Sequence, residues 1–204
     1  MRIGVLGGTF DPIHNGHLAV AEDVRLQLSL DEVIFVPAGQ PWLKTDSPIL
    51  AAGHRVEMVR LAIADKAYCS VSTTEVSREG PSYTLDTLAE LWTRFGAGDE
   101  VFFILGWDSL SDLPRWKDPE GLIRLCHLVA VPRPGCPRPD LDSLEKSIPG
   151  LSHRVILLDK PEVDVSASDI RERIVRGVSI SGLVPEVVEE YIREHGLYLG
   201  KQVV

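Results

Sequence analysis

The feature that most constrains this chain is a segment near its start, residues 7–17, which reads GGTFDPIHNGH. It follows a short apolar run at 3–6, typical of a buried strand, and precedes a helical pattern at 18–28. Strand, glycine loop and helix in this order form a site where free backbone N–H groups and the helix dipole hold a phosphate. Because His14 and His17 lie three residues apart at the helix start, both imidazoles can face the same anion. The segment therefore predicts a phosphate-binding loop.

Apolar β-type runs alternate with helical patterns along the rest of the chain. The predicted strands are 3–6, 33–36, 71–76, 101–105, 128–131 and 155–158. The predicted helices are 18–28, 53–64, 84–95, about 118–125, 142–147, 168–176 and 185–194. This alternation predicts an α/β fold: a Rossmann-like, doubly wound, mainly parallel sheet with helices on both faces and ligands at the carboxyl ends of the strands. We expect residues 1–204 to form one domain, whose C-terminal part, about 166–204, is helical.

Composition narrows the classes of function. The net charge of −9 argues against sequence-independent nucleic-acid binding, which needs a cationic surface. A phosphorylated small molecule can still bind where a few cations are concentrated locally. No apolar run approaches about 18 residues, and no basic-then-apolar leader opens the sequence, so we expect a cytoplasmic location without a membrane partner. The three cysteines form no CxxC pair and no cluster with metal-ligand spacing, so no metal site is predicted.

The 7–17 segment resembles the (H/T)xGH signature of the nucleotidyltransferase superfamily, and its GGTFDPIHNGH form is similar to bacterial nicotinate-mononucleotide adenylyltransferases. Further motifs follow in family order, so that the resemblance extends from residue 3 to residue 198. It implies transfer of AMP from ATP to nicotinate mononucleotide, giving deamido-NAD and pyrophosphate in NAD biosynthesis. A nucleoside monophosphate is largely dianionic at neutral pH, so no general base is required. The reaction needs in-line placement and donors aimed at the charge that develops on the phosphoryl oxygens.

The resemblance implies residue roles at the ATP end of such a site. It assigns catalysis to His14, His17, Lys44 and Arg171, and ATP binding to Gly7, Gly8, Thr9, Phe10, Gly106, Asp108, Arg133, Ser166 and Ser168. Lys44 ends a loop, PWLK, that resembles the family's PPHK loop but lacks its second proline and its histidine. Arg171 lies in SASDIR, which resembles SxTxxR with serine in place of threonine. A helix cap is the alternative role for Ser168. Asp108 follows the strongest apolar strand, where a carboxylate commonly accepts hydrogen bonds from a ribose.

A second group of residues is assigned to the nicotinate nucleotide. The resemblance places Thr84, Trp116, Lys117 and Arg55 there, with Thr84 reaching the carboxylate and Trp116 beside the pyridine ring. Thr84 belongs to SYTLDT at a predicted helix start, and free N–H groups with a hydroxyl suit a carboxylate better than a neutral amide. This favours nicotinate over nicotinamide. Helix capping alone could explain the serine and threonines, and core packing alone could explain the tryptophan.

Several alternatives stay open. Asp11, before a proline at a loop bend, could be a metal ligand, but a structural carboxylate that accepts nearby N–H groups is the favoured interpretation. No paired carboxylates lie close by, so Mg²⁺ is expected to arrive on the ATP phosphates. The nearer rival function is a sister transferase that acts on nicotinamide mononucleotide or phosphopantetheine. The more distant rival is a nucleotide-binding regulator without turnover.

Overall fold

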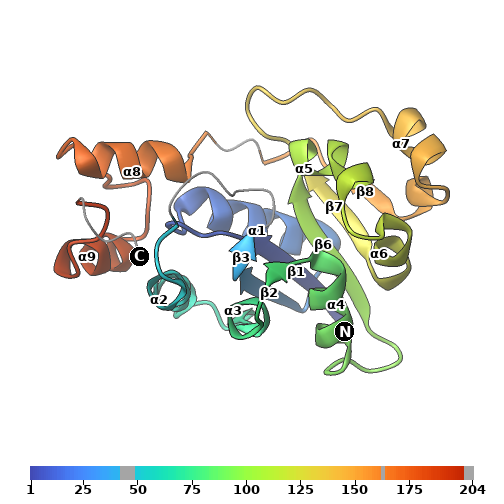
Figure 1. Cartoon of the computed structure of the whole chain (residues 1–204), viewed down its shortest axis with the longest axis horizontal. Coiled ribbons are helices and arrows are strands. Elements are labelled where there is room, and N and C mark those ends of the chain that lie inside the picture. Colours follow the sequence, from blue (N-terminus) through green and yellow to red (C-terminus); the bar gives the residue numbers. More distant parts are fainter. Residues whose placement is uncertain (42–48, 162–163, 200–204) are drawn as a thin grey trace.

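The computed structural model describes residues 1–41, 49–161 and 164–199. Within these ranges the centre is a six-stranded parallel sheet with the order β4-β2-β1-β6-β7-β8 (Figure 1). Its strands are β1 (Arg2–Gly8), β2 (Glu32–Pro37), β4 (Cys69–Val71), β6 (Glu100–Gly106), β7 (His127–Val131) and β8 (Val155–Leu157). The chain builds outward from β1 in one direction and then from β6 in the other, which is a doubly wound arrangement. The predicted fold class is confirmed.

Helices cover both faces of this sheet and bury two separate apolar cores. The first core lies under α1 (Asn15–Leu28), α2 (Ala52–Ile63), α8 (Ala167–Val175) and α9 (Glu186–Glu194). The second lies under α4 (Thr84–Trp92), α5 (Trp107–Ser111), α6 (Pro119–Leu125) and α7 (Leu141–Ser147). Along β2, Val33 and Phe35 face the first core while Ile34 and Val36 face the second, because strand side chains alternate. Burial on both faces explains why the strands are continuous apolar runs in the sequence.

The site is positioned by the junction between the two halves of the sheet. β1 pairs with β2 on one side and with β6 on the other, and Leu6 stands opposite Ile104 in that second ladder. Ligands of doubly wound sheets bind outside the carboxyl ends of the strands at such a switch point. Gly8 ends β1 and Gly106 ends β6, so the predicted phosphate loop and the predicted ribose loop emerge side by side.

Some predicted elements differ from the structure. The predicted strand 71–76 is wrong, because β4 ends at Val71 and the chain enters α3 (Thr74–Ser77). The hydroxyls of Ser72 and Thr74 lie 2.9 Å apart, and such local hydrogen bonds compete with a strand ladder. The predicted helix 84–95 ends at Trp92.

Short elements complete the fold. They comprise a two-stranded parallel sheet of β3 (Gln40–Pro41) and β5 (Pro81–Ser82) and the single turns η1 (Leu113–Arg115) and η2 (Leu151–His153). None of these was predicted, since elements of two or three residues carry no periodicity. Among the described residues, no helix combines the length and the apolar character that a membrane crossing requires.

Candidate active site

A cavity of about 680 Å³ opens at the carboxyl ends of β1 and β6. Most of the residues predicted from the sequence line it: Gly7, Gly8, Thr9, Phe10, His14, His17, Thr84, Gly106, Asp108, Trp116, Arg133, Ser166, Ser168 and Arg171. The volume lies within the usual range of small-molecule sites. Among the predicted site residues, Arg55 and Lys117 do not line this cavity, and Lys44 lies outside the described residues. The structure thus brings together side chains from both ends of the sequence.

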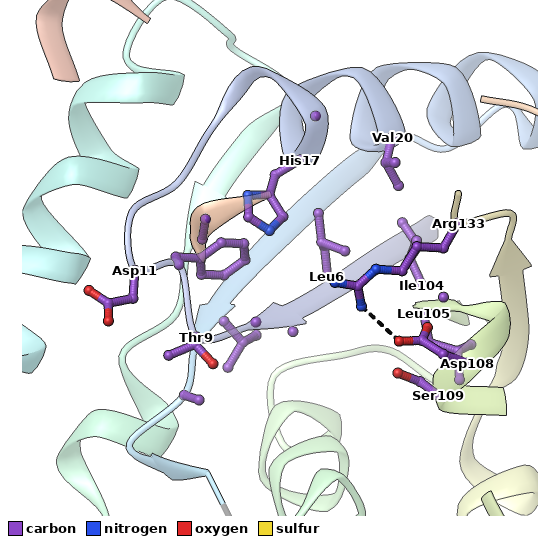
Figure 2. A pocket seen from close by; sticks show the side chains of 18 of the residues that line it. Leu6, Thr9, Asp11, His17, Val20, Ile104, Leu105, Asp108, Ser109 and Arg133 are labelled. Carbon is purple, nitrogen blue, oxygen red and sulfur yellow. Dashed lines mark hydrogen bonds and ion pairs between the residues drawn. The ribbon is translucent and has the colours of Figure 1, made fainter. Parts of the chain in front are cut away.

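His14 and His17 form a stacked pair at the start of α1. Their ring centroids are 3.7 Å apart, with an angle of 25° between the ring planes. The backbone N–H of His14 donates to Nδ1 of His17 at 3.3 Å, so Nε2 carries the proton of a neutral His17 ring. Figure 2 shows the His17 ring projecting from the helix start toward the cavity. This geometry presents an N–H donor to a ligand phosphate.

Burial decides the charge of the other imidazole. His14 is 7% exposed, and desolvation, followed by repulsion from Arg133, lowers its pKa to about 4. His14 is therefore neutral in the free enzyme at physiological pH. Two stacked imidazolium rings would repel each other, so a neutral His14 permits the close pairing.

Phe10 packs against the histidine pair from the core side. Its ring is 1% exposed and meets the His17 ring edge-on, with centroids 4.9 Å apart. On the other side it contacts Phe35 of β2 at 5.8 Å. Phe10 has a φ of 48°, a backbone conformation that non-glycine residues seldom adopt. Such strain persists where the surroundings fix the residue in place, and here it directs the ring into the core beneath His17.

Arg55 lies behind the phosphate loop. It is 2% exposed; its Nη1 donates to the carbonyl oxygen of Thr9 at 2.7 Å and its Nε to the carbonyl of Leu50 at 2.8 Å. Burial lowers the pKa of Arg55, while the nearby carboxylate of Asp11 opposes this effect. Arg55 therefore binds these backbone carbonyls and does not line the cavity. The expected contact of Arg55 with the nicotinate nucleotide lacks support. The sequence did not predict that Arg55 is buried, because a charged residue at a helix start is usually exposed to solvent.

Asp11 is a buried acceptor in the same loop. Oδ1 accepts a hydrogen bond from the hydroxyl of Tyr198 at 2.8 Å, and Oδ2 accepts the N–H of Leu50 at 3.4 Å. Burial and the neighbouring carboxylate raise the pKa of Tyr198. In Figure 2 the Asp11 carboxylate points away from Asp108 and Arg133. These contacts favour the structural interpretation of Asp11 over metal ligation. Tyr198 was not predicted, because no local pattern links residues so far apart.

Arg171 joins the C-terminal helices to the phosphate loop. Its Nη1 donates to the carbonyl oxygen of Asp11 at 2.7 Å, and its Nη2 to the hydroxyl of Ser168 at 3.3 Å. The cap of α8 is Ser166, whose hydroxyl accepts the N–H of Asp169 at 3.1 Å. The capping alternative thus falls on Ser166, and Ser168 is left to orient the guanidinium. Arg171 remains half-buried in the cavity wall, where it can meet an anion.

Asp108 and Arg133 face each other on the β6 side of the cavity. Arg133 Nη1 lies 2.7 Å from Asp108 Oδ2, as the dashed line in Figure 2 marks. Oδ1 of Asp108 is buried and has no hydrogen-bond partner among the described residues. A Cβ atom at Gly106 would lie 2.3 Å from that oxygen, so a larger residue there would displace the carboxylate from this position. Asp108 lines the cavity with its carboxylate held by Arg133, in a position where a carboxylate commonly accepts a hydrogen bond from a ribose hydroxyl.

Thr84 and Trp116 form the opposite end of the cavity. Thr84 is the first residue of α4, and Trp116 follows η1 with its ring edge-on to Phe103, centroids 6.2 Å apart. Lys117 instead pairs with Asp86 at 2.8 Å and lies in a smaller adjoining hollow. Residues that the sequence interpretation missed also line this end, namely Glu75, Ser82 and Thr87. A helix start with open N–H groups thus faces the same cavity as the histidine pair.

The fold and this cavity define a nucleotide-binding α/β enzyme of the nucleotidyltransferase class. Residues 5–173 match the model of the cytidylyltransferase-like family. A relative from Dehalococcoides mccartyi, named "probable nicotinate-nucleotide adenylyltransferase", is 53% identical over 97% of both chains. A relative of the same name from Moorella thermoacetica is 45% identical over 97% of this chain and 91% of its own. The chain belongs to the cytidylyltransferase-like family and, within it, to the nicotinate-nucleotide adenylyltransferases.

A solved structure supports the same fold. The nicotinic acid mononucleotide adenylyltransferase of Plasmodium falciparum, complexed with NaAD, superimposes with a TM-score of 0.77 at 21% identity, over 97% of both chains. At this identity the likeness is evidence for the fold. Together with the family membership, it confirms the predicted enzyme class: the chain is a nucleotidyltransferase, and its family carries out adenylyl transfer in NAD biosynthesis.

Proposed function

We propose that the substrates of this chain are ATP and nicotinate mononucleotide, and that the cavity at the ends of β1 and β6 joins them into deamido-NAD with release of pyrophosphate. One observation carries the proposal. The histidine pair and Arg171 line the same cavity as the start of α4 at Thr84, so anion-binding groups for phosphates and for a carboxylate face one another.

The phosphate end supplies donors rather than a base. The monophosphate of the substrate attacks the α-phosphorus of ATP as a dianion, and the bond to the pyrophosphate oxygen breaks. Nε2–H of His17 and the guanidinium of Arg171 donate to oxygens on which negative charge increases. Because Arg171 and the loop at Asp11 are already joined in the free enzyme, little reorganisation is required at the reacting phosphate.

The other residues orient the two nucleotides. Asp108 offers its carboxylate on the cavity wall to the ribose of ATP, and Arg133 beside it holds the carboxylate in place. At the far end, the hydroxyl of Thr84 and the first N–H groups of α4 receive the nicotinate carboxylate. The indole of Trp116 contributes an aromatic surface to the pyridine ring.

A cytoplasmic location is part of the same proposal.

Mg²⁺ enters this proposal as part of the ATP substrate. Within the described ranges no group of three or more His, Cys, Asp or Glu residues is arranged to hold a metal ion. The carboxylate of Asp11 is engaged by Tyr198 and Leu50. Mg²⁺ prefers to keep several waters and to bind substrate phosphates, so the ion would travel on the triphosphate with few ligands from the protein.

The direct test is release of pyrophosphate from Mg-ATP, measured in parallel with nicotinate mononucleotide, nicotinamide mononucleotide and phosphopantetheine. We expect a large preference for nicotinate mononucleotide, because only its ring carries a carboxylate that can bind the Thr84 hydroxyl and the N–H groups at the start of α4. Equal use of both pyridine nucleotides would refute the carboxylate site. Release with phosphopantetheine alone, or with none of the three, would refute the proposed substrates.

A further inference from the structure

Glu75 is an acidic residue in the cavity for which the proposed chemistry has no use. It lies on α3, is 9% exposed and lines the end of the cavity that Thr84 forms. Burying a carboxylate is costly unless its oxygens are hydrogen-bonded. A negative charge is also unfavourable where a substrate carboxylate is to bind. The contacts of the Glu75 side chain should therefore explain why a carboxylate is buried at this position.

Those contacts hold the first turn of α4. The hydroxyl of Thr87 donates to Glu75 Oε1 at 2.8 Å, and Thr87 is itself 1% exposed. Burial raises the pKa of Glu75, whereas hydrogen bonds from Thr87, Ser82 and the backbone of Gly39 act in the opposite direction. Ser82 and Thr87 stand on either side of Thr84 in the sequence. Oε1 of Glu75 is thus directed toward the protein segment that carries Thr84.

The same contacts reach the segment that follows β2. The N–H groups of Gly39 and Gln40 donate to the hydroxyl of Ser82 at 3.1 and 3.2 Å. The two backbones run unusually close, since a Cβ atom at Gly39 would lie 2.2 Å from the carbonyl oxygen of Glu75. The pairing of β3 with β5 adds a ladder between these segments. Glu75 thus lies where three pieces of chain meet: α3, the start of α4 and residues 39–41.

We propose that Glu75 is a positioning residue for the nicotinate nucleotide: by accepting the hydrogen bond of Thr87 it fixes the start of α4 in the orientation that receives the substrate carboxylate. The proposal rests on the proposed function, because it assumes that nicotinate mononucleotide binds at Thr84. Glu75 does not touch the substrate in this account. Its side chain acts through the hydroxyl of Thr87, so that the N–H groups at the start of α4 stay available to the ligand.

The test compares steady-state constants for both substrates in a small set of variants. In Glu75→Ala the KM for nicotinate mononucleotide should rise about tenfold or more, while the KM for ATP stays within about twofold. Thr87→Val removes the donor at nearly constant volume and should show the same pattern. Glu75→Gln keeps one acceptor oxygen and should restore much of the affinity. Glu120→Gln, an exposed glutamate on α6 away from these contacts, is the matched control and should leave both constants unchanged.

The double variant Glu75→Ala/Thr87→Val sharpens the result, since residues that act as one unit give effects that do not add. The proposal is overturned if both KM values rise together, or if neither changes while the melting temperature falls. If Glu75→Ala does not fold, Thr87→Val and Glu75→Gln decide by the same criteria. Wild-type protein without activity toward nicotinate mononucleotide would refute the proposed function, whereas active wild type with unaffected variants would refute the role of Glu75 alone.

Discussion

The phosphate end of the cavity is backed by buried polar groups from distant parts of the chain, whereas the nicotinate end is built on short elements. Behind the phosphate loop, Arg55 and Tyr198 bind the loop at Thr9 and Asp11. At the other end, the buried contact of Thr87 with Glu75 joins residues only twelve positions apart, and Lys117 pairs with Asp86 on the surface, where both side chains are partly exposed. Buried hydrogen bonds between distant segments fix the loop firmly, whereas an exposed ion pair contributes little to stability. The difference suits a rigid site for the reaction and a separate site for substrate selection.

The largest effect is expected for His17→Ala. Removing the Nε2–H donor should lower kcat about a hundredfold or more, because the group acts on charge that develops in the transition state. The free energy of unfolding should fall by about 0.5–2 kcal/mol, because the His17 ring also accepts the N–H of His14 at the start of α1. Steady-state assay of pyrophosphate release measures this. The exposed His153→Ala is the control. A kcat within about threefold of wild type would refute the catalytic role of His17.

The pH dependence of stability tests the burial of His14. Its folded pKa of about 4 lies below the ordinary value of 6.5. Between these values the unfolded chain binds a proton that the folded chain does not, so stability falls as the pH falls through this window. At about pH 5 the loss from this group should be roughly 2 kcal/mol relative to neutral pH.

Urea unfolding of wild type and His14→Asn at neutral pH and at about pH 5 isolates that contribution. The difference in free energy of unfolding between wild type and His14→Asn should narrow, or reverse in sign, at the lower pH, because the asparagine does not titrate. An equal gap at both pH values would show that His14 is not buried in its neutral form.

Tyr198→Phe tests whether the network behind the phosphate loop holds it in place. The change leaves Asp11 Oδ1 buried without its donor, which should lower the free energy of unfolding by about 1–3 kcal/mol. We expect kcat to fall as well, because the backbone carbonyl of Asp11 accepts a hydrogen bond from the guanidinium of Arg171. Tyr191→Phe removes a hydroxyl that pairs with His54 away from the loop and is the matched control. Equal losses in the two variants would contradict a special role for Tyr198.

The smallest effect is expected for Lys117→Met. Its ion pair with Asp86 is exposed, so the free energy of unfolding should change by less than about 0.5 kcal/mol. The KM for nicotinate mononucleotide should rise by no more than about threefold. A larger increase, with unchanged stability, would show that Lys117 leaves Asp86 to bind the substrate, as the family resemblance implies. Chemical denaturation and steady-state kinetics measure the two quantities.

The sequence predicted what is local and missed what is long-range. The central strands were found because burial on both faces makes them continuous apolar runs, as at Val33–Val36. The phosphate loop was found because its residues are contiguous. The contact of Tyr198 with Asp11 spans 187 positions, and neither residue has a periodic partner that points to it. Glu75 was missed because its segment, VSTTEV at 71–76, is rich in β-branched residues and was predicted as a strand, whereas the chain enters α3 there and Glu75 lines the cavity.

The central claim is that one end of the cavity governs the reaction and the other selects the nucleotide. It is tested most directly by the ratio of kcat/KM for nicotinate over nicotinamide mononucleotide in wild type, His17→Ala and Thr84→Val. We predict that His17→Ala lowers both values and leaves the ratio unchanged, whereas Thr84→Val lowers the ratio about tenfold. A ratio that shifts equally in both variants, or that does not change in Thr84→Val, would contradict the separation of the two ends.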